Sequence, residues 1–176
     1  MGTRTYPPTV FVLGTDRDIG KTVTCIGIIA KLLAPEHGYR VEQIGYIKPV
    51  GQQTLTVLNG EGVPIQADKD AVLVTSLMGI QCHGYEKASP VVWADGVTAE
   101  YIDSARAGDP LEGREAFMDL IRDAYDHVSA DKRIVIVEDD LDIARLLTLE
   151  LSEAGYEVHA FDGGVRGLTA IRELQP

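Results

Sequence analysis

A glycine-bearing stretch near the start of the chain carries residues suited to binding phosphate. It reads Gly-Thr-Asp-Arg-Asp-Ile-Gly-Lys-Thr over residues 14–22, between an apolar run and a segment with helical periodicity. Backbone N–H groups at a helix N-terminus can surround an anion, a lysine adds positive charge for the β- and γ-phosphates, and a threonine hydroxyl can bind Mg²⁺. The candidate phosphate-binding residues are Thr15, Asp16, Asp18, Ile19, Gly20, Lys21, Thr22 and Val23, and Lys21 is also a candidate catalytic residue.

The spacing of this loop departs by one residue from the consensus pattern G-x-x-x-x-G-K-[ST]. The consensus requires glycine at position 15, where this chain has Thr15, and Gly14 stands one position earlier. The alternative interpretation is a glycine-bearing turn that leads into a helix and binds nothing. The apolar run before the loop and the helical pattern after it favour phosphate binding.

Further candidates lie at the ends of the other expected strands. Lys48 follows an apolar run and precedes a proline, Asp70 lies in the first turn of an expected helix, and Glu138 and Asp139 follow the run Ile-Val-Ile-Val. Lys48 could instead be an exposed lysine at a strand end, and Asp70 could simply complement the helix dipole. Two adjacent acids after a buried strand favour a bound cation, because desolvated like charges repel each other.

The elements that would position these residues alternate between strand and helix. Short runs of β-type residues indicate buried strands, and apolar residues at spacings of three and four indicate helices. We expect strands at 10–14, 43–47, 90–93, 133–138 and 156–161, helices at 23–33, 68–78, 111–128, 141–154 and 164–174, and a loop at 51–64. This alternation predicts an α/β fold with a mainly parallel sheet flanked by helices, formed by residues 1–176 as a single domain.

Four segments in the same order resemble the dethiobiotin synthetase family and its relatives. They are the loop at 14–22, Tyr-Ile-Lys-Pro-Val at 46–50, Asp-Lys-Asp-Ala at 68–71 and Val-Ile-Val-Glu at 135–138. The resemblance implies a P-loop NTPase-like fragment over residues 1–132 that binds ATP and Mg²⁺. It also implies that Thr22, Asp70 and Glu138 hold the metal, and that Lys48 faces the γ-phosphate as a second candidate catalytic residue.

After Glu138 the sequence departs from that family, whose glutamate precedes a glycine-rich loop. From Lys132 onward the chain is similar to the first half of a response-regulator receiver domain, a flavodoxin-like fold, in which Glu138 and Asp139 would be the acidic Mg²⁺ pair. The strand that would carry the phosphoacceptor aspartate is not among these residues, so receiver phosphorylation is not expected. Both resemblances share strand 133–138, which suggests a deliberate, engineered chimera of a P-loop fragment and a receiver-like fragment at 133–176. The alternative is a natural truncated gene product.

The two resemblances compete for one place in the sheet. Receiver geometry would place strand 156–161 beside strand 133–138, where the P-loop family places the strand that ends at Lys48. One strand must therefore shift, or two chains must share strands in a homodimer.

Composition and charge limit the classes of molecule that this chain is expected to bind. The formal charge of −11, without a run of basic residues, argues against nucleic acid and anionic membranes, and no apolar stretch is long enough to span a bilayer. Two distant cysteines are typical of a reduced, cytoplasmic protein. We expect a nucleotide-binding protein with little or no turnover, at most a weak Mg²⁺-dependent ATPase. The alternatives are an inert designed scaffold with a vestigial loop and, less favoured, an ATP-dependent ligase.

Overall fold

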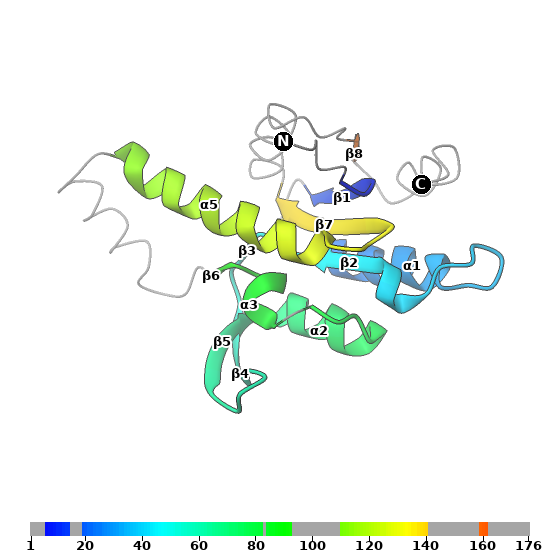
Figure 1. Cartoon of the computed structure of the whole chain (residues 1–176), viewed down its shortest axis with the longest axis horizontal. Helices are drawn as coiled ribbons and strands as arrows, with labels where there is room; N and C mark the ends of the chain where they lie inside the picture. Colours follow the sequence, from blue (N-terminus) through cyan, green and yellow to red (C-terminus); the bar gives the residue numbers. More distant parts are fainter. Residues whose placement is uncertain (1–5, 15–18, 83, 93–109, 141–158, 162–176) are drawn as a thin grey trace.

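The structure is a computed structural model that describes residues 6–14, 19–82, 84–92, 110–140 and 159–161 (Figure 1). For residues 110–116, 139–140 and 159–161 it describes the backbone alone. In chain order the described elements are β1 (Thr9–Gly14), α1 (Lys21–Leu32), the short 3-10 helix η1 (Val41–Gln43), β2 (Ile44–Ile47), β3 (Val50–Gly51), β4 (Thr54–Leu58), β5 (Pro64–Asp68), α2 (Lys69–Met78), α3 (Tyr85–Ala88), β6 (Val91–Val92), α5 (Pro110–Ser129), β7 (Ile134–Asp140) and β8 (His159–Phe161).

A parallel four-stranded sheet in the order β2-β7-β1-β8 forms the centre of the fold. Ile44 of β2 pairs with Ile134 of β7, and Val12 of β1 pairs with Glu138 of β7. The carboxyl ends of β1, β2 and β7 therefore meet at one edge, where open α/β sheets bind their ligands. The expected α/β class, with a mainly parallel sheet flanked by helices, is confirmed.

Strand β7 contributes side chains to both faces of this sheet, as the period of two requires. Ile134 and Ile136 pack in a core with α1 and α2, whereas Val135 and Val137 pack in a second core with α5. Figure 1 shows α5 in front of the sheet and α1 behind it. All four side chains are at most 2% exposed, which explains why the Ile-Val-Ile-Val run has no polar residue.

The position of β8 corrects the expectation drawn from receiver geometry. Residues 159–161 pair with Val10, Phe11 and Val12 of β1, and not with β7. Both sides of β7 are occupied by β1 and β2, so a further strand can join only at an outer edge of the sheet, and β8 joins at the outer side of β1. The P-loop arrangement therefore holds around β7. The expected helices at 141–154 and 164–174, and residues 156–158 of the expected strand, lie outside the described residues.

The prediction of a loop at 51–64 is wrong, because this segment contains the end of β3, all of β4 and the first residue of β5. Strands β4 and β5 form an antiparallel hairpin that projects away from the central sheet (Figure 1). Asn59 closes it by accepting hydrogen bonds at Oδ1 from the backbone N–H groups of Glu61 and Val63 at 3.0 and 2.9 Å. An Asn-Gly pair between two apolar, alternating runs is a hairpin signal, and it was present at residues 59–60.

The remaining expectations agree with the structure in outline. The short strand expected at 90–93 is present as β6, which pairs with β3, and Trp93 lies outside the described residues. The helices at the other expected places are α1, α2 and α5. Among the described helices, none is both long and apolar enough to cross a bilayer.

Candidate functional site

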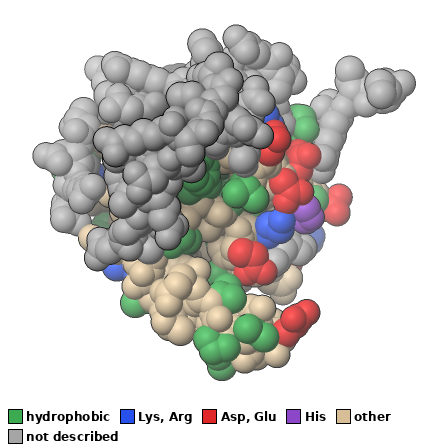
Figure 2. Space-filling view, turned by 90° about the vertical axis from the view of Figure 1, so that its left-hand side faces the viewer, with side chains coloured by type: hydrophobic (Ala, Val, Ile, Leu, Met, Phe, Trp, Pro, Cys, Tyr) green, Lys and Arg blue, Asp and Glu red, His purple; other side chains and the backbone are tan. Residues whose placement is uncertain are grey.

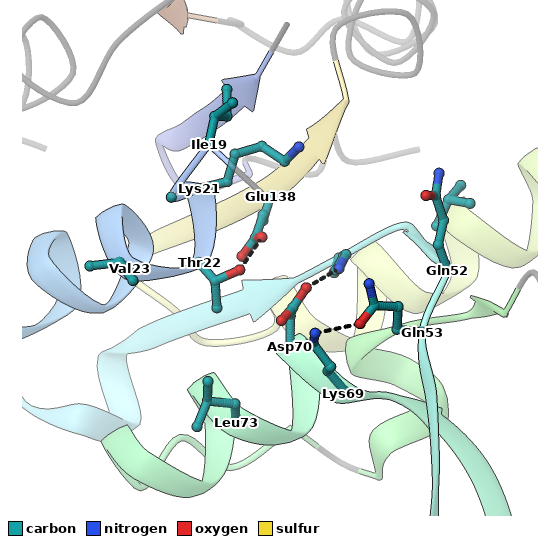
Figure 3. Close-up of a pocket in the computed structure, with 13 residues that line it drawn as sticks. Ile19, Lys21, Thr22, Val23, Gln52, Gln53, Lys69, Asp70, Leu73 and Glu138 are labelled. Carbon is teal, nitrogen blue, oxygen red and sulfur yellow. Dashed lines mark hydrogen bonds and ion pairs between the residues drawn. The ribbon is translucent and has the colours of Figure 1, made fainter. Parts of the chain in front are cut away.

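A pocket opens at the carboxyl edge of the sheet, between the first turn of α1 and the start of α2 (Figure 3). Its volume of about 370 Å³ is in the range of small-molecule sites. It is lined by Ile19, Gly20, Lys21, Thr22, Val23, Lys48, Val50, Gln52, Gln53, Lys69, Asp70, Leu73 and Glu138.

The first wall of the pocket is the N-terminus of α1. Gly20 precedes the helix with a φ of 89°, a left-handed conformation that glycine adopts without strain, and no side chain caps the helix at this residue. Backbone N–H groups in the first turn of a helix are suited to bind an anion. Gly14 permits the close return of the chain, because a Cβ there would lie 2.6 Å from Ile19 Cδ1 and 2.8 Å from Lys21 Cδ.

Behind this wall, Glu138 at the end of β7 accepts two short hydrogen bonds from hydroxyl groups. Thr22 donates from Oγ1 to Glu138 Oε1 at 2.7 Å, and Tyr46 donates from its hydroxyl to Glu138 Oε2 at 2.7 Å. Glu138 is 1% exposed and Tyr46 is fully buried. We call Thr22, Tyr46 and Glu138 the hydroxyl cluster.

Burial and the charge of Glu138 act on the neighbours of this carboxylate. Desolvation, followed by the electrostatic effect of Glu138, raises the pKa of Tyr46 well above its ordinary value. The same two causes, in the same order, raise the pKa of the buried Cys25 thiol. Both groups therefore stay protonated at neutral pH, and Tyr46 remains a hydrogen-bond donor to Glu138.

The second wall begins with Lys48, which follows β2 and reaches two acids at the start of α2. Lys48 Nζ lies 2.6 Å from Asp70 Oδ2 and 3.1 Å from Asp68 Oδ1. Asp68 is fully buried and caps α2 by accepting hydrogen bonds from the backbone N–H groups of Asp70 and Ala71. We call Lys48, Asp68 and Asp70 the lysine cluster.

The acids of the lysine cluster keep the Lys48 side chain protonated. Burial alone would lower the pKa of Lys48, but the hydrogen bond that Lys48 donates to Asp70 and the charges of Asp68, Asp70 and Glu138 together raise it. Lys48 is therefore a cation at neutral pH, and its charge also reaches the hydroxyl cluster.

The structure brings most of the candidates from the sequence into this one pocket. Ile19, Gly20, Lys21, Thr22, Val23, Lys48, Asp70 and Glu138 all line it. The side chain of Val23 is 71% exposed, so any contribution of this residue to phosphate binding would come from its backbone.

The remaining candidates cannot be placed in the pocket. Thr15, Asp16 and Asp18 lie outside the described residues, and Asp139 belongs to β7 but its side chain is not described. Their roles stay predictions.

Tyr46, Asp68 and Gln53 are among the contributors to the site that sequence reasoning missed. Tyr46 and Asp68 were within the quoted motifs but had no assigned role, and Gln53 lay in the segment expected to be a loop. Tyr46 lies two positions before Lys48, and this spacing would have placed the two on one face of a strand. Asp68 followed by a helical pattern is an N-cap signal. Gln53 accepts a hydrogen bond from Lys69 Nζ at the pocket wall (Figure 3).

The donor set suits Mg²⁺. This ion is usually bound in NTPase sites by one or two protein oxygens, with phosphate and water oxygens completing the coordination. Thr22 Oγ1 and Glu138 Oε1 lie together at the pocket, and Asp70 supplies a carboxylate on the opposite wall. In the described residues there is no cluster of three or more His, Cys, Asp or Glu side chains that could hold a metal unaided.

Comparison with known proteins agrees with this geometry. The family model AAA_26, described as an AAA domain, matches residues 8–139. A separate, short match is to the DNA-binding response regulator MtrA of Mycobacterium tuberculosis (strain ATCC 25618 / H37Rv) and of Mycobacterium leprae (strain TN). Each is 40% identical over 45 residues, which is 26% of this chain.

The chain spans only 20% of the length of these response regulators. This fits the receiver-like segment and says nothing of their DNA-binding activity here. No solved structure gives a significant match. The family model covers most of the chain, including both walls of the pocket, and the chain therefore belongs to this dethiobiotin synthetase-like family of P-loop NTPase domains.

Proposed function

We propose that the pocket binds the phosphates of ATP together with Mg²⁺. The observation that carries this proposal is the 2.7 Å hydrogen bond between Thr22 Oγ1 and Glu138 Oε1, beside Lys21 in the first turn of α1. This bond joins a hydroxyl and a carboxylate that are 116 residues apart in the chain. Both groups lie beside the first turn of α1, where we expect the phosphates to bind. Membership of a P-loop NTPase family supports the same ligand.

In this proposal each residue has a separate role. The N–H groups of the first turn of α1 and the Lys21 ammonium hold the β- and γ-phosphates, because both present positive charge to the same space. Thr22 and Glu138 hold Mg²⁺, with Asp70 and Asp139 as further candidate ligands. The metal would neutralise phosphate charge. Lys48 stays protonated and orients the terminal phosphate from the opposite wall.

We further propose little or no catalytic turnover. Glu138 is followed by Asp139 and Asp140, where the resemblance to the family leads us to expect a glycine-rich loop. If the chain hydrolyses ATP, a weak Mg²⁺-dependent ATPase is the expected activity, and turnover at the rate of a dedicated ligase would contradict this.

We also propose that the chain is a chimera that folds as one domain. The family model ends at residue 139, a separate match of 45 residues to response regulators fits the receiver-like segment, and β1 pairs with both β7 and β8. A single cooperative unfolding transition is expected, and two separate transitions would contradict the one-domain part of this proposal.

Calorimetric titration of Mg·ATP into the 176-residue chain tests the binding. We expect saturable binding that Lys21→Ala weakens by about tenfold to a hundredfold, because a charge-assisted contact contributes about 1.5–3 kcal/mol. Lys31→Ala is the matched control. It removes the same charge from the last turn of the same helix, where Lys31 pairs with Glu36 at 2.5 Å, far from the pocket.

Two outcomes would contradict the proposal. If the unmodified chain gives no heat with millimolar Mg·ATP, the loop is vestigial and the chain is an inert scaffold. If Lys21→Ala and Lys31→Ala weaken binding equally, ATP does not bind at this loop.

A further inference from the structure

The two oxygens of the Glu138 carboxylate have different surroundings. Oε1 accepts the hydrogen bond from Thr22 Oγ1 at 2.7 Å on the side of the pocket (Figure 3). Oε2 accepts the hydrogen bond from the Tyr46 hydroxyl at 2.7 Å, and Tyr46 is fully buried behind the pocket. An incoming cation therefore meets one oxygen of Glu138 at the pocket, while the other oxygen is already engaged on the core side.

The sheet holds Tyr46 in this position. Its Cα partner across the parallel pairing of β2 and β7 is Ile136, which lies two positions before Glu138 and therefore on the same face of the sheet. Tyr46 and Ile136 pack in the core that α1 and α2 cover. Because close-packed neighbours enclose the ring, its hydroxyl has little freedom to leave Glu138 Oε2.

Carboxylates with one and with two available oxygens suit different divalent cations. Mg²⁺ is small and requires near-ideal octahedral geometry, whereas Ca²⁺ accepts a larger, less regular shell that often includes both oxygens of one carboxylate. The two oxygens of a carboxylate lie too close together to fill two corners of a small octahedron. A glutamate with one oxygen occupied by a hydrogen bond therefore favours Mg²⁺.

We propose that Tyr46 is a positioning residue that makes this pocket select Mg²⁺ over Ca²⁺. By occupying Oε2, its hydroxyl leaves Glu138 a single oxygen for the metal. This inference rests on the proposed binding of ATP with a divalent cation, and it adds the residue that decides which cation is preferred. Hydrogen-bond partners of metal-binding side chains change metal affinity by about 10- to 100-fold, so the effect is measurable.

Calorimetric titration of ATP with saturating Mg²⁺, with saturating Ca²⁺ and with excess chelator measures this preference. The gain from each metal is the Kd for ATP in chelator divided by the Kd with that metal. We expect a larger gain from Mg²⁺ than from Ca²⁺ in the unmodified chain. In Tyr46→Phe the ratio of the two gains should fall by about tenfold, whereas a mere loss of packing would lower both gains alike and leave the ratio unchanged.

Tyr125→Phe is the matched control. Tyr125 is also a buried tyrosine, and its hydroxyl forms a short hydrogen bond with Thr9 Oγ1 at 2.5 Å. It packs in the core on the opposite face of the sheet, with α5. This variant also loses a buried phenol hydroxyl, and it should keep the metal ratio of the unmodified chain.

The gain in ATP affinity is a sharper measure than metal binding alone. The chain has a formal charge of −11, and Figure 2 shows acidic side chains on its surface beside Lys, Arg and His side chains. Divalent cations are therefore attracted to the surface as well as to the pocket. Surface binding of this kind does not involve Tyr46, so it should not change the ratio between the variants.

A Tyr46→Phe chain that keeps the metal ratio of the unmodified chain would overturn this inference and leave the binding of Mg·ATP intact. An unmodified chain that gains as much from Ca²⁺ as from Mg²⁺ would overturn it without any variant, so the test holds even if Tyr46→Phe fails to fold. An unmodified chain that gains nothing from either metal would overturn both this inference and the proposed function.

Discussion

The hydroxyl cluster and the lysine cluster lie on opposite walls of one pocket. They differ in the groups that contact their carboxylates. Glu138 is buried and accepts hydrogen bonds from two neutral hydroxyls, whereas Asp68 and Asp70 contact the ammonium of Lys48. In the lysine cluster one ammonium contacts both carboxylates and offsets one of their two charges. The hydroxyl cluster retains a carboxylate beside the space where phosphate would enter, and this difference points to Glu138 as the principal site for an added cation.

The comparison predicts that the lysine cluster matters more for folding. Replacing Lys48 with Met would leave Asp68 fully buried without its cation, and we expect a loss of about 3 kcal/mol in the free energy of unfolding. Lys69→Met is the matched control, because Lys69 begins the same helix and donates to the neutral Gln53. It should change stability by less than about 0.5 kcal/mol.

Chemical denaturation at pH 7 measures both variants. Equal losses would show that the charge of Lys48 is not needed to hold Asp68, and the contrast between the two clusters would fail.

A smaller change in the free energy of unfolding is expected as the pH rises into the alkaline range. This change depends on Tyr46 of the hydroxyl cluster and on its buried neighbour Cys25. The pKa values of Tyr46 and Cys25 are raised in the folded chain, so the unfolded chain loses these protons first as pH rises. Their contribution to stability is therefore complete below the ordinary values of 9.0 for Cys25 and 10.0 for Tyr46, and is lost as pH rises above them. Burial raises the pKa of Tyr125 to about 12, and its contribution has the same sign.

Denaturation curves from pH 7 to pH 11 check this expectation. Tyr46→Phe cannot ionise and should lose less stability between pH 7 and pH 11 than the unmodified chain, although it starts lower by about 1 kcal/mol for the missing hydrogen bond to Glu138. Parallel curves for the two chains would show that Tyr46 titrates normally and does not hold Glu138.

The sequence predicted the residues that lie near strand ends and missed those whose role depends on distant partners. Thr22 and Glu138 were recognised because a loop after a strand and an acid after a buried run converge at one edge of a parallel sheet. Tyr46 looked like an ordinary core residue, since its hydroxyl gains a role only through a carboxylate 92 positions away. The residues next to Tyr46 in the sequence do not indicate that a carboxylate so far away along the chain will contact its hydroxyl.

The errors in the fold have a similar origin. The segment at 51–64 contains glycines and glutamines that favour a loop, and their influence outweighed the Asn-Gly pair at 59–60. The place of β8 could not be predicted, because an apolar strand does not encode which parallel neighbour it will join. Strands β1 and β2 occupy both sides of β7, which leaves β8 an outer edge of the sheet, and β8 pairs there with β1.

The most direct test of the account is the Mg²⁺ dependence of ATP binding in three chains, measured by calorimetry with Mg²⁺ and with excess chelator. Mg²⁺ should strengthen ATP binding in the unmodified chain. In Glu138→Gln this gain should fall by about tenfold or more, which corresponds to about 1.4 kcal/mol or more. Asp70→Asn should lose less of it, because Asp70 is already engaged by Lys48 at 2.6 Å. A Glu138→Gln chain that folds and keeps the full Mg²⁺ gain would contradict the claim that the hydroxyl cluster receives the metal.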